Sequence, residues 1–323
     1  MTHAIRVHQP GGPEALRWEA VEVGDPGPGE VRVVQRAVGL NYIDVYHRTG
    51  LYPLPAPFTP GVEGAGVVDA VGDGVTDVAV GDRIAYAGPI GGYAEARLIP
   101  ADRLVRLPET IDFEQAAAMM LQGMTAHMLL HSVRQVRAGE TILVHAAAGG
   151  VGLILCQWAA ALGAQVIGTV SSAAKAALAG AHGCHHPIIY TQSDFVAETL
   201  RITGGAKLPV VYDSVGKDTF LRSMDCLAPR GLMVSFGQSS GPVEPLSPNL
   251  LAQHGSLFLT RPTLFTYIAD PAELRSAANA LFEVVTQGLV RVEVHQRFAL
   301  ADAADAHRAL EARKTTGSTI LTI

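Results

Sequence analysis

Cysteine is scarce in this chain, and its scarcity excludes two kinds of small scaffold. The 323 residues hold three cysteines, Cys156, Cys184 and Cys226, which are odd in number and far apart. Such spacing gives neither a disulfide framework nor a CxxC metal pair. Cys156 and Cys226 lie in apolar sequence and are expected to be small buried hydrophobic residues.

Charge is also sparse, and the chain has no run of basic residues. Charged residues make up 17% of the chain and hydrophobic residues 48%, and the formal net charge is −6. This composition is typical of a well-packed globular protein and gives no electrostatic reason to expect nucleic acid as a partner. The first residues, MTHAIRVHQPGG, lack the pattern of a secretion signal, so a cytoplasmic enzyme is expected. The length is sufficient for two domains.

Charged side chains are absent from residues 141–170. A hydropathy scan would take this stretch for a membrane span, because about 20 apolar residues cross a bilayer. However, glycines cluster at residues 149–152, after the β-branched run at residues 141–144, and a second apolar run follows at residues 165–170. This order predicts a strand, a tight turn, a helix and a second strand rather than a membrane span.

The glycine turn predicts a dinucleotide site, because it joins backbone N–H groups to the positive end of a helix dipole. The motif departs from G-x-G-x-x-G: Ala147 takes the first glycine position, and Gly149 and Gly152 take the others. Alanine still permits a tight turn if its φ stays negative. The flanking strand, helix and strand favour a dinucleotide site over a glycine-rich packing turn.

An acidic residue is missing where the second strand ends. NAD sites usually carry Asp or Glu there, about 20 residues past the glycines, to bind the ribose 2′-hydroxyl. This chain has Ser171, Ser172 and Lys175 instead. Two hydroxyl groups and a cation suit a 2′-phosphate, which favours NADPH as the cofactor. The alternative for Lys175 taken alone is one more solvated lysine on a helix.

The periodicity divides the chain into a β-rich part and an α/β part. Before residue 114, short runs of period two alternate with Gly, Pro and Asp, as is typical of strands and turns. Residues 114–130 take helical spacing, and strands and helices alternate from residue 141 to about residue 259. This alternation predicts an α/β fold with a doubly wound parallel sheet. The tail after residue 269 is expected to pack on the first part.

Four segments resemble one known family: NYIDVYHRTGLYP at residues 41–53, HAAAGGVGLILCQWA at 145–159, VVYDSVGKDT at 210–219 and RGLMVSFGQSSG at 230–241. They are similar to the NADPH:quinone oxidoreductases, the ζ-crystallin-like, zinc-free branch of the medium-chain dehydrogenase/reductase superfamily. The resemblance covers the chain almost from end to end and is greatest to the bacterial quinone reductases.

The resemblance implies a Rossmann domain inserted into a GroES-like, β-rich catalytic domain, with the active site in the cleft between them. The Rossmann NADPH-binding domain would cover residues 124–262. The GroES-like catalytic domain would cover residues 1–123 and 263–323.

The zinc-dependent alcohol dehydrogenases of the same superfamily provide a contrast. Their zinc-ligand and proton-relay positions correspond here to Asn41, Val62 and Ile43, so the resemblance implies no metal site. Reduction of a ketone produces an alkoxide that needs a Lewis acid or proton donor, whereas a reduced quinone is a phenolate with a conjugate acid of pKa about 10. An electron-poor acceptor therefore fits the missing zinc, and catalysis would rest on holding the nicotinamide C4 close to it.

The resemblance also implies the site residues. The catalytic candidates are Asn41, which would hydrogen-bond the nicotinamide or a quinone oxygen, and Tyr46 and Tyr52, which would orient or line the ring. A helix N-cap for Asn41 and packing for the tyrosines are the alternatives. The residues expected to bind the cofactor are Asn41, Asp44, Thr125, Gly149, Gly150, Val151, Ser171, Ser172, Lys175, Tyr190, Phe236, Gly237, Gln238, Ser239 and Arg313. His127 and Met128 depart from the close bacterial relatives, which have tyrosines there, so the substrate would differ in shape.

An NADPH-dependent quinone reductase, transferring hydride or single electrons, is the leading hypothesis. The enzymatic alternative is reduction of an activated C=C bond in an alkenal or enoyl compound, whose enolate product likewise needs no zinc. A crystallin-like or RNA-binding role is the alternative of another class; the negative charge argues against RNA, and the retained cofactor residues argue against a purely structural role. The family commonly dimerises through the edge strand of its nucleotide domain, here residues 256–260, so a homodimer is expected.

Overall fold

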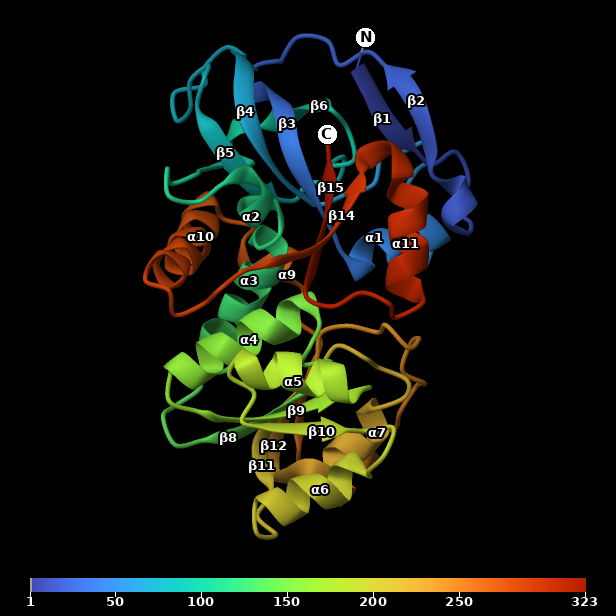
Figure 1. Cartoon of the computed structure of the whole chain (residues 1–323), viewed down its shortest axis with the longest axis vertical. Helices are drawn as coiled ribbons and strands as arrows, with labels where there is room; N and C mark the ends of the chain where they lie inside the picture. The colour runs from blue at the N-terminus through green and yellow to red at the C-terminus, as the bar shows by residue number, and fades with distance from the viewer. Residues whose placement is uncertain (1) are drawn as a thin grey trace. The chain divides into compact units, whose positions relative to one another are not determined.

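The computed structural model describes residues 2–323, which form two compact units. The β-rich unit comprises residues 2–124, 268–286 and 292–323, and the α/β unit comprises residues 125–267 and 287–291. Each unit has its own sheet and its own buried core (Figure 1).

A parallel sheet forms the centre of the α/β unit. Its strand order over the described residues is β10-β9-β8-β11-β12-β13, so the chain builds outward from β8 to one side and then to the other. This is the strand order of the Rossmann fold, which binds its ligand where the order reverses, here between β8 and β11. The strands are β8 (Thr141–Val144), β9 (Gln165–Val170), β10 (His186–Ile189), β11 (Leu208–Asp213), β12 (Leu227–Ser235) and β13 (Phe258–Thr260). The prediction of a doubly wound α/β fold is confirmed.

Helices cover both faces of this sheet. In Figure 1, α4 and α5 lie on one face, and α6 and α7 lie on the other. Buried side chains such as Leu143, Ile167 and Val211 fill the space between sheet and helices. The helices are α4 (Gly150–Ala161), α5 (Ala173–Ala181), α6 (Phe195–Ile202), α7 (Phe220–Ser223), α8 (Asn249–Gln253) and α9 (Leu264–Tyr267).

The uncharged stretch at residues 141–170 is therefore β8, α4 and β9. Parallel strands that are covered on both faces are apolar at nearly every position, which explains its composition. Helix α4 has 12 residues, fewer than the roughly 20 that cross a bilayer. Within residues 2–323, every helix is too short or too polar to span a membrane.

A mixed sheet organises the β-rich unit, with strand order β14-β15-β3-β4-β5-β7 and with β6 paired to β3 beside this path. Strand β3 (Glu30–Leu40) is central, because it pairs with β4, with β6 and, near its end, with β15. Leu40 lies opposite Thr319, so the tail completes a sheet that the first residues begin. The other strands are β4 (Glu63–Val71), β5 (Arg83–Ala87), β6 (Ala96–Pro100), β7 (Val105–Arg106), β14 (Val294–Ala299), β15 (Ser318–Thr322) and the separate antiparallel pair β1 (Thr2–Arg6) and β2 (Arg17–Val21).

The helical pattern at residues 114–130 is interrupted in the structure. The backbone N–H of Ala118 divides its hydrogen bond between the carbonyls of Glu114 and Gln115, at 3.0 and 3.2 Å, and this tightening ends the first helix. The pattern becomes α2 (Phe113–Ala117), α3 (Met120–His127) and a π-helical turn (Met128–Val133).

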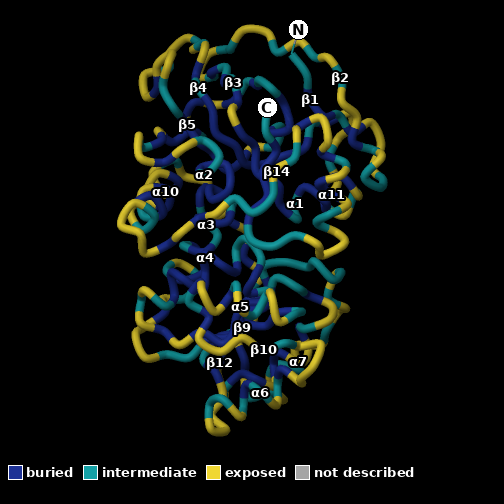
Figure 2. Tube along the Cα trace, in the orientation of Figure 1, coloured by how far each residue is buried: buried dark blue, intermediate teal, exposed yellow. Residues whose placement is uncertain are grey.

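The remaining helices frame the β-rich unit. They are α1 (Tyr42–Thr49), α10 (Pro271–Thr286) and α11 (Ala303–Glu311), with 3₁₀ turns at Pro13–Ala15, Ala101–Arg103 and Leu300–Asp302. The 3₁₀ turn at Met224–Cys226 belongs to the α/β unit. Figure 2 shows buried residues along the central strands of this unit and of the α/β sheet. Helix α1 starts directly after β3, so the junction at Asn41 is fixed by the sheet core.

Candidate cofactor and active site

The turn between β8 and α4 is tight, and its strained residue is Ala146 rather than Ala147. Ala146 has a φ of 53°, and its carbonyl accepts the backbone N–H of Gly149 at 2.9 Å. A Cβ added to Gly152 would lie 2.3 Å from the carbonyl oxygen of Ala146. Glycine at position 152 is therefore required for α4 to start this close to the turn.

The first turn of α4 fits an anionic group. Gly149 is the N-cap and contributes no side chain to cap the helix, and Gly150 and Val151 follow it half-buried. The turn carries no acidic residue. Backbone N–H groups at such a helix start point outward and, with the helix dipole, favour a phosphate. The turn therefore fits the pyrophosphate of a dinucleotide.

The end of β9 brings together four of the residues predicted to bind the cofactor. The Ser172 hydroxyl accepts the backbone N–H of Lys175 at 3.3 Å and caps α5, so both residues share one helical turn. The carbonyl of Ser171 accepts the hydroxyl of Thr191 at 3.1 Å, and Tyr190 donates its backbone N–H to Val170 at 3.0 Å. This edge carries two hydroxyl groups, an ammonium group and the half-exposed Tyr190 ring, with no carboxylate in residues 171–175.

The segment after β12 is held against the end of β11. The Asp213 carboxylate is fully buried and accepts the backbone N–H groups of Val215 and Gly216 at 2.7 and 3.1 Å. The Asp213 carbonyl accepts the backbone N–H of Phe236 at 2.8 Å, and a Cβ on Gly237 would lie 2.5 Å from the Ser214 carbonyl oxygen. The predicted residues of this segment are Phe236, Gly237, Gln238 and Ser239. Asp213 orders the loops that follow β11 and β12, and no role was predicted for it from the sequence.

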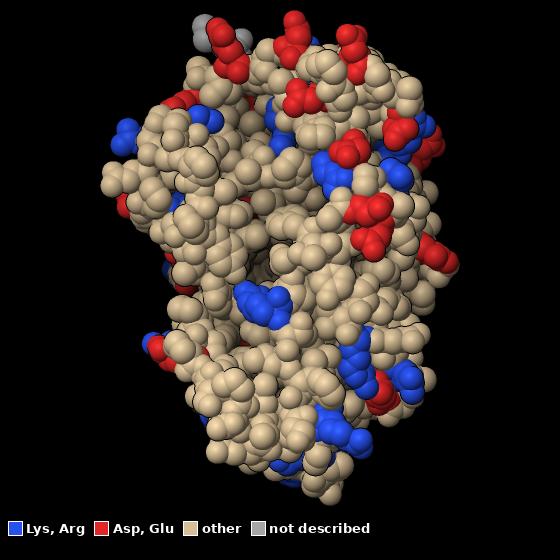
Figure 3. Space-filling view, turned by 180° about the vertical axis from the view of Figure 1, so that it is seen from behind, with Lys and Arg blue, Asp and Glu red and all other residues tan. Residues whose placement is uncertain are grey.

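The two units differ in charge. The α/β unit carries ten Lys and Arg against seven Asp and Glu, whereas the β-rich unit carries 14 against 23. On the face drawn in Figure 3, acidic side chains gather over the β-rich unit and basic ones predominate over the α/β unit. The unit with the predicted nucleotide site is thus the positively charged part of an acidic protein, which favours an anionic ligand.

In the β-rich unit, buried groups hold the side chain of Asn41. Its Nδ2 donates to Glu63 Oε2 at 2.5 Å, and its Oδ1 accepts from Gln122 Nε2 at 3.2 Å. The Ser318 hydroxyl on β15 donates to Gln122 Oε1 at 2.8 Å. Asn41 also takes the N-cap position of α1 and forms a capping box with Asp44. The amide orientation is fixed, and one Nδ2 hydrogen remains outside this chain of hydrogen bonds.

Two buried carboxyl groups flank Asn41. Asp44 Oδ2 accepts the backbone N–H of Asn41 at 2.9 Å and the Tyr93 hydroxyl at 3.0 Å. Burial raises the pKa of Asp44 to about 7, although these hydrogen bonds oppose the rise. Burial also raises the pKa of Glu63 to about 8, against the opposing effect of the Asn41 hydrogen bond. Glu63 is therefore mostly a neutral acid at pH 7.

Aromatic rings cluster beside this helix. Tyr46 is buried, and its ring meets that of Tyr52 edge-on with centroids 5.1 Å apart. The ring centroid of Tyr42 lies 6.0 Å from that of Tyr46. Arg313, with a φ of 57° just after α11, lies close enough to lower the pKa of Tyr42 in opposition to burial, which raises it. The predicted residues of this unit therefore form one neighbourhood around α1.

Helix α3 and strand β4 contribute three further residues near the candidate site, namely Thr125, Gln122 and Glu63. Thr125 lies half-buried in α3. Glu63 and Gln122 both bind Asn41, but the sequence gives them no predicted role, because these contacts join β4 and α3 to a residue far away in sequence. The one available signal was the presence of a carboxylate and an amide in otherwise apolar segments. No group of three or more His, Cys, Asp or Glu side chains in residues 2–323 is arranged to hold a metal ion.

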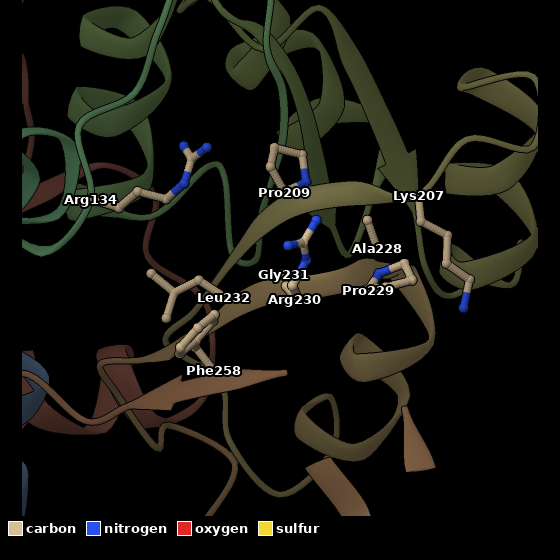
Figure 4. Close-up of a pocket in the computed structure, with 9 residues that line it drawn as sticks. All are labelled: Arg134, Lys207, Pro209, Ala228, Pro229, Arg230, Gly231, Leu232 and Phe258. Carbon is tan, nitrogen blue, oxygen red and sulfur yellow. The ribbon is translucent and has the colours of Figure 1, made fainter. Parts of the chain in front are cut away.

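A cavity of about 470 Å³ lies in the α/β unit, at the start of β11 and β12. Its lining includes Arg134, Lys207, Arg230 and Phe258. Figure 4 shows the three cationic head groups pointing in different directions, with that of Arg230 toward Pro209 and that of Lys207 away from it. The cavity contains none of the predicted site residues, and its cations do not converge on one ligand position.

Comparison with known proteins agrees with this architecture. Residues 27–109 match the family model described as alcohol dehydrogenase GroES-like domain, and residues 150–280 match the model described as zinc-binding dehydrogenase. The chain is 54% identical to a quinone oxidoreductase of Pseudomonas aeruginosa and 44% identical to a 2-haloacrylate reductase of Burkholderia sp., covering 99% of this chain and of each relative. The structure of Escherichia coli quinone oxidoreductase complexed with NADPH superposes with a TM-score of 0.98 at 47% identity, over 99% of this chain and 100% of the other.

The fold and the two matched models define a medium-chain dehydrogenase/reductase with a GroES-like part and a Rossmann part. Within that superfamily, the chain belongs to the quinone oxidoreductase family. The resemblance seen in the sequence is confirmed.

Proposed function

We propose that this protein is an NADPH-dependent quinone reductase. The observation that carries the proposal is the similarity, over nearly the whole chain, to a quinone oxidoreductase whose structure was determined with NADPH. The same similarity extends to the relative from Pseudomonas aeruginosa at 54% identity.

The residues that would hold NADPH lie at the ends of the strands in the α/β unit. Gly149, Gly150 and Val151 would bind the pyrophosphate through backbone N–H groups at the start of α4. Ser171, Ser172, Lys175 and Tyr190 would bind the 2′-phosphate and the adenine side of the cofactor. Support comes from the hydroxyl groups and the cation at the end of β9, from the missing carboxylate and from the positive charge of this unit.

The catalytic candidates would act by positioning. NADPH, when bound, supplies the hydride or the electrons. Asn41 would donate its remaining Nδ2 hydrogen to a carbonyl oxygen of the nicotinamide or the quinone, because Glu63 and Gln122 fix its amide plane. Tyr46 and Tyr52 would present ring edges and faces to a planar acceptor. Since the product of quinone reduction is a phenolate with a conjugate acid of pKa about 10, an amide donor is strong enough to stabilise it.

Reduction of an activated C=C bond is the second candidate. The 2-haloacrylate reductase of Burkholderia sp. is 44% identical over 99% of this chain, and its name describes such a reaction. The product would be an enolate, which the same Asn41 donor would stabilise.

We also propose a homodimer formed through β13 at the edge of the α/β sheet. Phe258 and Leu259 on this strand are 62% and 37% exposed, which is unusual for large hydrophobic residues on a sheet edge. A second copy paired antiparallel to β13 would cover them and continue the sheet.

Steady-state oxidation of NADPH and NADH tests the function. The purified, EDTA-treated protein is assayed with 1,4-benzoquinone, a naphthoquinone and an α,β-unsaturated aldehyde. We expect NADPH turnover with a quinone that EDTA does not change, and a drop of about 10–100-fold in kcat for Asn41→Ala if one transition-state hydrogen bond is lost. Turnover with the aldehyde alone would move the assignment to C=C reduction. NADPH binding without turnover of any acceptor would contradict both proposals.

A further inference from the structure

Two histidines lie one helical turn apart in the α/β unit. His127 ends α3 and His131 lies in the π-helical turn that follows. Their ring centroids are 4.8 Å apart with an interplanar angle of 32°. Histidines at positions i and i+4 of a helix face the same side, which is the spacing by which helical His pairs bind a metal ion.

Both rings are available as ligands. They are half-buried, no hydrogen bond joins either ring to another group in residues 2–323, and neither has a ring nitrogen buried without a partner. The ring nitrogens are therefore in contact with solvent. Burial lowers the pKa of His127 to about 4, with a further contribution from His131, and burial also lowers the pKa of His131. Neutral imidazole is the form that binds metal.

The Trp158 ring on α4 packs against both histidine rings. Its ring centroid lies 5.6 Å from that of His127 and 5.6 Å from that of His131, at interplanar angles of 47° and 62°. These contacts hold the two imidazoles beside each other on one side of a buried indole. Two imidazoles bound to one ion at about 2.0–2.1 Å would have centroids roughly 5 Å apart, close to the observed separation.

We propose that His127 and His131 form a two-imidazole binding site for a divalent transition-metal ion, with water completing the coordination. Imidazole nitrogen suits Cu²⁺, Ni²⁺ and Zn²⁺, and Cu²⁺ binds most tightly in that series. With two protein ligands the site is open and exchangeable, unlike a closed four-ligand structural zinc site. Its test does not depend on the proposed reductase activity, because it measures metal binding alone.

Fluorescence of Trp158 provides a direct test. The chain has two tryptophans, so the full-length Trp18→Phe variant reports on Trp158 alone. In a non-coordinating buffer, Cu²⁺ is expected to quench the emission saturably with one ion per chain, and excess Zn²⁺ is expected to restore it by competition. His127→Gln and His131→Gln, each in the Trp18→Phe background, are expected to weaken Cu²⁺ binding at least tenfold, because each leaves one imidazole.

The exposed His186 on β10 provides a matched control, and His186→Gln is expected to leave the Cu²⁺ affinity unchanged. Thermal unfolding establishes that all three variants are folded, as expected for substitutions of half-buried or exposed side chains. Three outcomes would overturn the proposal: no saturable quenching, wild-type affinity in either His127→Gln or His131→Gln, or an equal loss of affinity in His186→Gln.

Discussion

At the residue scale, Lys175 is the cation proposed above to bind the 2′-phosphate of NADPH. Lys175→Ala is expected to raise the KM for NADPH about tenfold and to leave the KM for NADH nearly unchanged, because NADH has no 2′-phosphate for the ammonium group to bind. Steady-state kinetics with both cofactors measures the difference. Lys207→Ala, at the opposite end of the sheet strands, is the control and should alter neither value. An equal rise for both cofactors would rule out a role for Lys175 at the phosphate.

The buried Glu63 carboxyl group predicts how the stability of the folded protein depends on pH. Its pKa is raised in the folded state to about 8 from 4.5, so the folded protein holds this proton more tightly than the unfolded chain. The resulting stabilisation is complete below about pH 4 and is lost as the pH rises through about 8. Glu63→Gln keeps an oxygen acceptor for Asn41 and removes the titration.

Urea unfolding of the wild type and Glu63→Gln at several pH values measures this effect. Between about pH 5 and about pH 9 the wild type should lose on the order of a few kcal/mol in the free energy of unfolding relative to the variant. Asp44 is present in both proteins, so its titration contributes to both curves. Parallel curves would mean that Glu63 is ionised in the folded protein throughout this range.

At the scale of elements, the start of α4 depends on Gly152. Gly152→Ala would place a Cβ 2.3 Å from the carbonyl oxygen of Ala146, so the turn or the helix has to move. We expect a loss of about 1–3 kcal/mol in stability and at least tenfold weaker NADPH binding. Gly180→Ala is the matched control, because a Cβ at this position of α5 meets no atom within 4 Å. Thermal unfolding and cofactor titration measure both effects; normal NADPH affinity in Gly152→Ala would contradict the assignment.

The sequence predicted elements well where apolar runs are bounded by glycines. Strand β9 spans the predicted residues 165–170, because both faces of that strand are covered and most of its positions are therefore apolar. Strands β2 and β10 were not predicted. β10 is a four-residue edge strand, HPII, and its Pro187 argues against a strand. The sequence of β2 lacks an apolar strand pattern, because half or more of its side chains face solvent.

In the candidate site, features set by local backbone geometry were predictable from the sequence, and contacts set by tertiary packing were not. The glycine turn and the serines after β9 depend on local backbone geometry, so the sequence could point to them. The contacts of Asn41 with Glu63 and Gln122 depend on how β4 and α3 pack against the end of β3, and no local pattern encodes that packing. The positive φ at Ala146 was likewise not predicted, because the glycine motif places its first position at Ala147.

At the scale of the whole molecule, the proposed dimer gives a measurable mass. Light scattering after size exclusion should report about twice the chain mass of 33.9 kDa for the wild type. Phe258→Glu should report the mass of one chain, because a charge on the edge strand opposes pairing. Val80→Glu alters an equally exposed hydrophobic residue of the β-rich unit and should leave the mass unchanged. A wild-type monomer would contradict the proposed dimer.

The pairing of β3 with β15 has a consequence for the order of folding during synthesis. The α/β sheet is formed by strands from residues 141–260, so it can form as soon as this segment has left the ribosome. Leu40 on β3 cannot pair with Thr319 on β15 until the chain is about 280 residues longer. The late formation of such distant contacts slows folding. Ser318, which orients Gln122 beneath Asn41, emerges with that last strand. We therefore expect a nascent chain to fold its α/β unit before the residues proposed to act in catalysis are in place.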